Sequence, residues 1–447
     1  MTKSILTVGD SVNDKPDDTP YRLVGIPDGL GAYDNGDGTF TLLANHELTS
    51  TDGIVRAHGS RGAFVSKWTI DKATLQVLEG RDLIEEIAFW NGDAATGAYG
   101  APVSGTAATT LNRLCSADLP ARSALFNIAS GKGYDGRLFL DGEEVSEGRG
   151  FAHAEDGTSY ELAQFGNLAF ENSVANPATG DQTVVASTDD TSTPNDASGN
   201  PLPYFGGQVY IHHGTKKATG NPAEKAGLTG GTLYGIKVDG MQNERAGFVQ
   251  SSTFSLVPLS DQSQKTGVQL ELESHTGGVT EFARPEDTAW DPTNPNVLYV
   301  NTTNAFGLPS RLWKLTFADP ADPNKGGTIE AVLDGTEGQQ MLDNLTVNGR
   351  GQVIEQEDPG NNAYLAKLRL YDPASDSLTE IAKHDPDRFL PGGSSFLTLD
   401  EESSGVIDAA SILGEGWYLA DVQAPYRTDA ELVEGGQLLA LHLPPRH

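Results

Sequence analysis

The sequence predicts an all-β protein, a six-bladed β-propeller with long loop insertions, formed by a single domain over residues 1–447. Two observations lead to this prediction. The chain has 52 glycines and 24 prolines, which interrupt it every few residues, and the segments between them alternate in the manner of strands. A similar layout also recurs about six times, in units of roughly 50–75 residues. Four-stranded units of this size around an axis form a propeller.

Four copies of the repeat place an acidic residue six positions before a turn residue. The pairs are Asp28 and Asp34, Glu171 and Pro177, Glu286 and Pro292, and Asp343 and Gly349. A second polar cluster follows each turn: Asn45 to Glu47, Asp189 with Asp190, Asn304, and Glu357 with Asp358. Strand ends that are alike on successive blades face the same axis. The repeat therefore predicts carboxylates that converge on one point, as they do in a metal site.

The local pattern also gives the expected elements. Strands are predicted at 39–43, 297–300, 311–315, 352–355, 365–371 and 417–420, and helices only near Asp82–Phe89 and Ala409–Leu413. Thr191–Pro203 and Lys216–Gly230 are predicted to be surface loops, because they are rich in Gly, Pro, Asn, Lys and Thr. The segment from Asp34 to Gly38 is predicted to be a hairpin turn, since a calcium loop would need Glu where Asn45 stands.

Composition narrows the class of partner. The formal net charge is −32, from 62 acidic residues against 30 Lys and Arg, which excludes nucleic acid as a ligand and suits a protein that binds cations. The single cysteine, Cys115, excludes an intrachain disulfide. No apolar run approaches the roughly 20 residues of a membrane helix. The N-terminus has no signal-peptide pattern, which at face value predicts cytoplasm, but scarce cysteine and strong acidity also suit export by another route.

Several residues have two interpretations from the sequence alone. Cys115 is either a small buried apolar residue or a thiolate ligand for a transition metal. Of Glu143 and Glu144, at most one faces inward if both lie on a strand. Arg284 forms either an ordinary ion pair with Glu286 or a bidentate contact with a phosphate. His212 and His213 either bind a metal or lie at the surface, and their position in the middle of a hairpin favours the surface. The chain contains neither a phosphate-binding glycine loop nor a nucleophile elbow.

Five segments resemble the PhoX-type alkaline phosphatases and their phytase-like relatives, a family of six-bladed propellers. These segments are 45–47, 170–171, 284–286, 343–345 and 402–405. The resemblance implies that Cys115, Glu171 and Glu286 bind iron as Fe³⁺, and that Glu144, Glu47 and Asp358 bind Ca²⁺. It further implies that Asn45 and Arg284 hold the phosphate, while Asp28 and Asp343 only shape the blades.

The function implied by the resemblance is that of a metal-dependent phosphomonoesterase, which hydrolyses a small-molecule phosphate ester in the extracellular space or the periplasm. The chain departs from the family pattern at Gln423-Ala424-Pro425, where the family has Gln-His-Pro, and around Glu144, where it has Cys-Glu-Glu. Two alternatives therefore stay open. One is a non-catalytic, calcium-stabilised propeller that serves as a binding module of a larger secreted protein. The other is a calcium-dependent lactonase or esterase.

Overall fold

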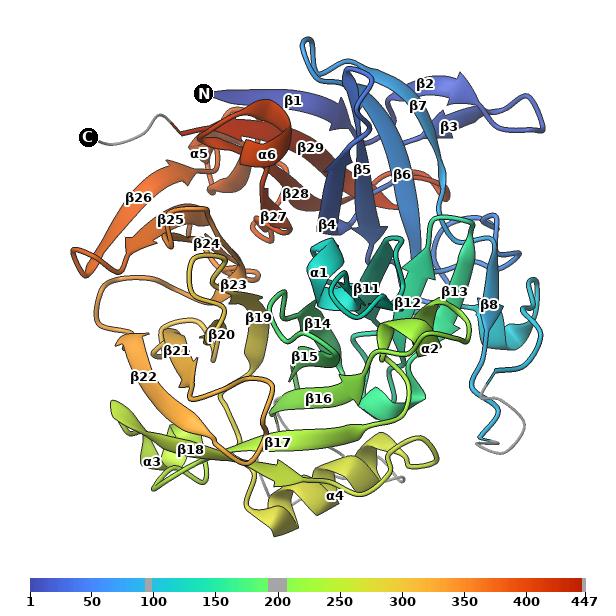
Figure 1. The fold of residues 1–447 in the computed structure, drawn as a ribbon. Helices are drawn as coiled ribbons and strands as arrows, with labels where there is room; N and C mark the ends of the chain where they lie inside the picture. The colour runs from blue at the N-terminus through green and yellow to red at the C-terminus, as the bar shows by residue number, and fades with distance from the viewer. Residues whose placement is uncertain (93–98, 192–206, 444–447) are drawn as a thin grey trace.

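The computed structural model describes residues 1–92, 99–191 and 207–443. Strands dominate it, as predicted, and they form sheets that are arranged around a common centre (Figure 1). Four of these sheets have four strands each and one has nine. Among the described residues, no helix is long and apolar enough to cross a membrane.

The four-stranded sheets come from the parts of the chain before Phe170 and after Leu333. From the centre outward, the first contains β4 (Pro27–Asp34), β5 (Thr39–His46), β6 (Phe64–Asp71) and β7 (Val77–Asp82). The second contains β11 (Leu138–Gly142), β12 (Gly150–Ala154), β13 (Thr158–Glu161) and β8 (Glu86–Ala88). Another contains β23 (Leu342–Val347), β24 (Val353–Glu357), β25 (Lys367–Asp372) and β26 (Ser377–Lys383). The last contains β27 (Val406–Asp408), β28 (Trp417–Arg427), β29 (Glu434–His442) and β1 (Thr2–Thr7).

The nine-stranded sheet has a central strand at each of its two ends. Its order is β14 (Phe170–Ala175), β15 (Gln182–Asp189), β16 (Val209–Thr215), β17 (Thr232–Val238), β18 (Ser251–Pro258), β22 (Gly327–Leu333), β21 (Arg311–Phe317), β20 (Val297–Thr302) and β19 (Pro285–Trp290). The outer strands β18 and β22 pair antiparallel and join the two halves. Two short hairpins, β2 (Ser11–Asp14) with β3 (Pro20–Arg22) and β9 (Phe126–Asn127) with β10 (Lys132–Gly133), lie outside these sheets.

The described helices are short. They are α1 (Arg122–Leu125), α2 (Pro222–Ala226), α3 (Glu244–Gly247), α4 (Gly267–Gly277), α5 (Pro386–Phe389), α6 (Ala410–Leu413) and the 3₁₀ turns η1 (Ala107–Thr109) and η2 (Ala163–Phe165). The longest, α4, begins at a capping box of Thr266 and Gln269 and ends at Gly278 in the left-handed conformation.

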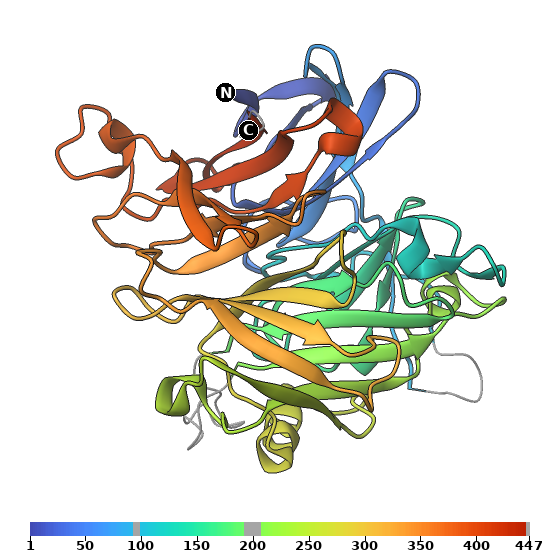
Figure 2. The same ribbon diagram turned by 60° about the vertical axis from the view of Figure 1, so that its left-hand side comes forward.

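The two ends of the chain close the ring. Strand β1 pairs antiparallel with β29, from Thr2 opposite Leu441 to Thr7 opposite Gln437, so the last sheet contains both the first and the last strand. Both views show β1 beside the C-terminal strands (Figures 1 and 2). Apolar clusters fill the space between neighbouring sheets; in one, Val297 and Tyr299 of β20 pack with Leu342 and Leu345 of β23. This burial holds the central strands in fixed positions.

A β-bulge recurs at the start of four central strands. In β4, Pro27 pairs with His46 and Leu30 pairs with Ala44, so three steps along β4 match two along β5. The same extra residue occurs in β14 between Phe170 and Ser173, in β19 between Pro285 and Thr288, and in β23 between Leu342 and Leu345. A bulge turns a side chain away from the regular alternation of the strand. Each of these bulges contains the acidic residue of the sequence repeat, namely Asp28, Glu171, Glu286 or Asp343.

A repeated hydrogen bond fixes the neighbouring strand end. The residue after the second strand donates its backbone N–H to the carbonyl oxygen of the residue before the central strand. The pairs are Glu47 to Ile26, Asp190 to Ala169, Thr303 to Arg284 and Asp358 to Met341, at 2.9–3.0 Å. Thus the polar cluster after each turn returns to the end of the sheet where the bulge lies.

Most local predictions agree with the structure, with three exceptions. The strands predicted at 39–43 and 297–300, the hairpin turn after Asp34 and the helix near Ala409–Leu413 are confirmed. The helix predicted near Asp82–Phe89 is wrong, because this segment becomes β8 and extends the second sheet. Lys216–Gly230 is not simply a surface loop, since it contains α2 and the buried Lys216. Helix α4 was missed. Of Thr191–Pro203, residues 192–203 lie outside the described residues.

Gly29, the second residue of the first bulge, gives a test of this geometry. Its N–H donates to the carbonyl oxygen of Cys115 at 3.1 Å, and an added Cβ would lie 2.4 Å from the backbone nitrogen of Ala117. We predict that Gly29→Ala lowers the free energy of unfolding by about 1–3 kcal/mol, because the backbone after Cys115 must move. Gly349→Ala is the control, since nothing lies within 4 Å of its added Cβ. Equal urea midpoints for the two variants would contradict the prediction.

Candidate metal centre

Acidic side chains form a continuous row at the end of the central strands. Four groups of three residues each place one ligand atom per residue within 4.8 Å of the others. The groups are Asp28, Glu47 and Cys115; Cys115, Glu144 and Glu171; Glu171, Glu286 and Asp343; and Asp343, Asp358 and Glu402. Each group shares a residue with the next, through Cys115, Glu171 and Asp343 in turn. We call these nine residues, together with Asp190, the acidic row.

The repeat explains why most of these residues meet. Asp28, Glu171, Glu286 and Asp343 are the four bulge residues, while Glu47, Asp190 and Asp358 follow the second strands. The second and last sheets contribute through single bridges. Leu114 bridges to Glu143, which places Cys115 and Glu144 at the row, and Glu402 bridges to Gln423.

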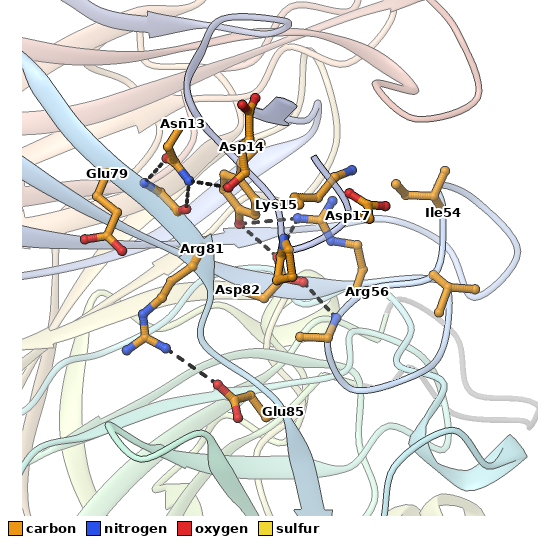
Figure 3. A pocket seen from close by; sticks show the side chains of 15 residues that line it. Asn13, Asp14, Lys15, Asp17, Ile54, Arg56, Glu79, Arg81, Asp82 and Glu85 are labelled. Carbon is orange, nitrogen blue, oxygen red and sulfur yellow. Dashed lines mark hydrogen bonds and ion pairs between the residues drawn. The ribbon is translucent and has the colours of Figure 1, made fainter. Parts of the chain in front are cut away.

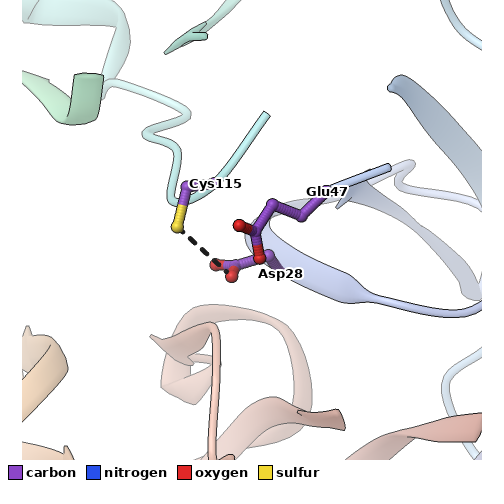
Figure 4. A group of neighbouring side chains, drawn as sticks. All are labelled: Asp28, Glu47 and Cys115. Atoms are coloured by element: carbon purple, nitrogen blue, oxygen red, sulfur yellow. Dashed lines mark hydrogen bonds between the residues drawn. The ribbon is translucent and has the colours of Figure 1, made fainter. Parts of the chain in front are cut away.

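At one end of the row, protein groups already bind the carboxylates. The Cys115 thiol donates to Asp28 Oδ2 at 3.5 Å, with Glu47 beside them (Figure 4). The Gln423 amide donates to Asp28 Oδ2 at 3.0 Å and to Glu47 Oε2 at 3.1 Å. Asn45 donates to the carbonyl oxygen of Cys115 at 2.8 Å. These contacts orient Asp28, Glu47 and Cys115 toward one another.

Two arginines reach the row from its more open side. Arg284 donates Nε and Nη2 to the two carboxylate oxygens of Asp190, at 2.8 and 2.6 Å, and Nη2 also lies 3.0 Å from Glu286 Oε1. Arg113 Nη2 lies 2.5 Å from Glu47 Oε1 and also donates to Glu144. The Arg284 and Arg113 side chains are 28% and 42% exposed, whereas these four carboxylates are 5–12% exposed. Both arginines have a left-handed backbone, with φ of 59° and 49°.

Burial and mutual repulsion raise the pKa values of several carboxyl groups in the acidic row. Burial first, and then neighbouring carboxylates, raise the pKa of Asp28, Glu171, Glu286, Asp343 and Glu402 well above their usual range. Burial raises the pKa of Glu47 to about 8 despite Arg113, and that of Asp190 to about 6 despite Arg284. It also raises the pKa of the Cys115 thiol, as do Asp28 and Glu171. Without cations, the row therefore retains protons at neutral pH.

Two independent observations indicate that the residues of the acidic row are suited to bind metal cations. The row has nine carboxylates against two guanidinium groups, so arginine neutralises only a part of its charge. In addition, Asp28 Oδ1, Glu171 Oε1 and both carboxylate oxygens of the nearby Asp421 are buried and have no hydrogen-bond partner among the described residues. A buried carboxylate oxygen without a hydrogen-bond donor destabilises the folded protein unless a proton or a cation compensates its charge.

The structure brings together most of the residues that the sequence singled out. Cys115, Glu171, Glu286, Glu144, Glu47 and Asp358 all belong to the row. Asp28 and Asp343, which we expected only to shape the blades, carry ligand atoms in it as well. Asp190, Glu402 and Arg113 had no assigned role, although Asp190 lies in a repeat cluster and Glu402 in a segment of family resemblance. Glu143 faces away from the row and pairs with Arg149 at 2.6 Å.

Two buried histidines, His212 and His153, lie outside the acidic row. His212 is fully buried against Phe165, with a ring distance of 4.5 Å, so the surface position predicted for it is wrong. The reason is that its strand, β16, lies inside the nine-stranded sheet. His153 lies 2.7 Å from Asp141 and 2.6 Å from Ser159, in an arrangement like a hydrolase triad. All three residues are buried, so this network supports the second sheet and has no access to a substrate.

A large cavity lies apart from the row. Its volume is about 690 Å³, and it is lined by the β2–β3 hairpin, the loop 54–57 and the segment from Glu79 to Glu85 (Figure 3). At its base, Arg56 pairs with Asp82 at 2.5 Å. None of the residues of the acidic row lines this cavity.

Comparisons with known proteins support the fold. No protein-family model matches the sequence, and no curated protein sequence matches it either. The structure is similar to that of Pseudomonas fluorescens PhoX in complex with vanadate, a transition state analogue, with a TM-score of 0.69, 12% identity, and coverage of 98% of this chain and 94% of that chain. Trypanosoma rangeli sialidase in complex with sialic acid has a TM-score of 0.44 and 11% identity, with 99% of this chain and 59% of the sialidase covered. The PhoX likeness shows a propeller-type fold for this chain.

The raised pKa of Glu47 predicts how the cation-free protein responds to pH. Between its usual value of 4.5 and about 8, folded Glu47 holds a proton that the unfolded chain has lost. Stability should therefore fall as pH rises through this window. We expect the melting temperature in chelator to decrease from pH 5 to pH 8, and excess calcium to abolish most of the decrease.

Two variants separate this effect from general charge repulsion. Glu47→Gln should reduce the pH slope of the chelated protein, because the amide has no proton to lose. Glu79→Gln, at an exposed position, removes the same formal charge and should leave the slope unchanged. Parallel profiles for the wild type and Glu47→Gln would contradict the interpretation.

Proposed function

We propose that this chain is a metal-dependent phosphomonoesterase whose active site is the acidic row. The observation that carries the proposal is the juxtaposition of four overlapping cation-binding groups with Arg284, a guanidinium that faces the more open side. The vanadate in PhoX, a protein with the same fold, supports phosphate chemistry at such a site.

If the nine-stranded sheet is divided into β14–β18 and β19–β22, the ring has six blades, which we assign to one domain over residues 1–447.

The donor atoms suggest which cations would bind. A thiolate mixed with carboxylates favours a transition metal, so we assign Fe³⁺ to the groups around Cys115, Glu171 and Glu286. Glu171 shares one group with Cys115 and another with Glu286, so it would bridge two ions. The group of Asp343, Asp358 and Glu402 offers oxygen only, which favours Ca²⁺. We also assign Glu47 and Glu144 to Ca²⁺, as the resemblance implies.

Arg284 is the proposed phosphate-binding residue. Asp190 and Glu286 hold its guanidinium in place, and Nη1 makes no hydrogen bond or ion pair with any described residue. A fixed guanidinium suits a phosphate oxygen because it donates in a plane. Asn45 was predicted to share this role. Its amide nitrogen instead holds the Cys115 carbonyl, so we give Asn45 the role of positioning Cys115.

The proposed reaction is hydrolysis of a phosphate monoester. The oxygen of water bonds to phosphorus while the bond between phosphorus and the ester oxygen breaks, and a proton passes from the water to the leaving alcohol. Bound cations would neutralise phosphoryl charge and make water more acidic. The chain itself contributes Arg284, which orients the phosphate, and the carboxylates that hold the cations. We propose an extracellular or periplasmic location, as the resemblance implies.

The alternative functions use only part of this site. A calcium-stabilised binding module of a larger secreted protein, or a calcium-dependent lactonase or esterase, needs the oxygen-only groups and no transition metal. Metal content therefore discriminates between them. We expect the purified protein to contain iron as well as calcium, and to show a visible iron–thiolate absorption band that Cys115→Ser removes. Calcium without iron would favour the alternatives.

The proposed activity depends on the carboxylates that would hold the cations. We predict that Glu286→Gln lowers hydrolysis of p-nitrophenyl phosphate by more than the ~10–100-fold that is typical of residues one shell further from a metal. The amide keeps the shape of the side chain, so the circular dichroism spectrum should not change. Glu330→Gln, at an exposed position on β22, serves as the control. Full activity of Glu286→Gln would exclude the proposed site.

A further inference from the structure

Arg113 has the same environment as Arg284 at another part of the acidic row. Each arginine has a left-handed backbone, and each guanidinium bridges one buried and one partly buried acidic residue: Arg113 bridges Glu47 and Glu144, while Arg284 bridges Glu286 and Asp190. Of the two arginines, the resemblance implies a role for Arg284 alone. The equivalence suggests that the two guanidinium groups act alike.

Hydrogen bonds fix the backbone of Arg113. Its N–H donates to the Leu48 carbonyl oxygen at 2.8 Å, and its own carbonyl oxygen accepts from the Glu144 N–H at 2.8 Å. The side chain contacts carboxylates through Nε and Nη2, while Nη1 has no such contact among the described residues. With 42% of the side chain exposed, Arg113 can donate to a ligand without leaving its partners.

The two arginines are separated by a short part of the row. Glu144, a partner of Arg113, lies in one group with Glu171, and Glu286, a partner of Arg284, lies in the next group with the same Glu171. Within each group the ligand atoms are at most 4.8 Å apart. A cation site shared by Glu171 would therefore lie between the two guanidinium groups. A substrate with one anionic group can use one arginine, whereas a substrate with two can use both.

We propose that Arg113 is a second anion-binding residue, and that the site takes phosphate esters or anhydrides that carry a second anionic group. This inference rests on the proposed function. Arg284 and the cations hold the phosphoryl group that is transferred to water, and Arg113 holds the other anion. The competing role for Arg113 is purely structural, as a clamp on Glu47 and Glu144. If Arg113 has only that structural role, its loss lowers the activity toward every substrate equally.

The test compares substrates with one and two anionic groups in the metal-loaded protein. We expect Arg113→Gln to lower kcat/KM for pyrophosphate by about 10- to 100-fold relative to its effect on p-nitrophenyl phosphate, the usual effect of losing one charge-assisted contact. Phosphoglycolate, whose second anionic group is a carboxylate, shows which kind of anion Arg113 binds. If Arg113→Gln lowers kcat/KM for phosphoglycolate as much as for pyrophosphate, Arg113 binds either anion. If kcat/KM for phosphoglycolate does not fall, Arg113 binds only a second phosphate group. Arg284→Gln should impair all three substrates.

Binding gives a readout that is independent of turnover. We expect Arg113→Gln to weaken the binding of methylenediphosphonate by a similar factor, as measured by calorimetry. The affinity for inorganic phosphate should stay nearly unchanged. Arg122→Gln is the control, since Arg122 is exposed and pairs with Asp135. Equal losses for all substrates, or a fall in metal content, would overturn the inference in favour of the clamp. If wild-type protein hydrolyses no phosphate compound, the proposed function fails, whereas the diphosphonate comparison still tests the second anion site.

Discussion

Repulsion among buried carboxylates is the constraint on which the rest of this structure depends. Nine carboxylates of the acidic row are held close together at the end of the central strands, and among the described residues Arg113 and Arg284 form ion pairs with four of them. Such a group of charges would move apart in a flexible chain. Here it cannot, because each carboxylate comes from a strand, the residue directly after a strand, or a bridge, and the closed ring of sheets sets the position of all of these. The pairing of β1 with β29 completes that ring. Folding therefore opposes the repulsion until protons or cations compensate the charge, which couples cation binding to stability.

The bulge is the local device that makes the convergence possible. A regular strand would alternate its side chains between the two faces of the sheet, where the neighbouring sheets pack. The extra residue breaks this alternation directly after the first residue pair of each ladder. It thereby directs the acidic residue of the bulge toward the centre, namely Asp28, Glu171, Glu286 or Asp343. Gly29 shows the cost of the arrangement. The backbone after Cys115 passes so close that the first bulge has no room for a side chain. The thiol and the carboxylates are brought together by the same close contact.

The periodic part of the sequence predicts more of the structure than the segments outside the repeat do. The spacing of acid, turn and second polar cluster predicted the all-β class and the meeting of Glu171 and Glu286, because a repeated hairpin places equivalent residues in equivalent positions. The same spacing placed Asp28 and Asp343 among the converging carboxylates, whereas the resemblance implied that they only shape the blades. The helix expected near Asp82–Phe89 failed because its apolar residues pack against the second sheet as an edge strand. Helix α4 carried a capping box in the sequence, at Thr266 and Gln269, that was overlooked.

By itself, the sequence determined the strand-forming character of the chain, the period of its hairpins and the excess of acid, since these depend on local composition and spacing. Only the tertiary structure decided which residues outside the repeat join its acids. Cys115, Glu144 and Glu402 lie outside the regular repeat and reach the row through single bridges from other sheets. The roles of Arg113 and Arg284 likewise follow from side chains that converge across the ring. Contacts between residues so far apart in the chain depend on ring closure and packing, and no local pattern encodes them.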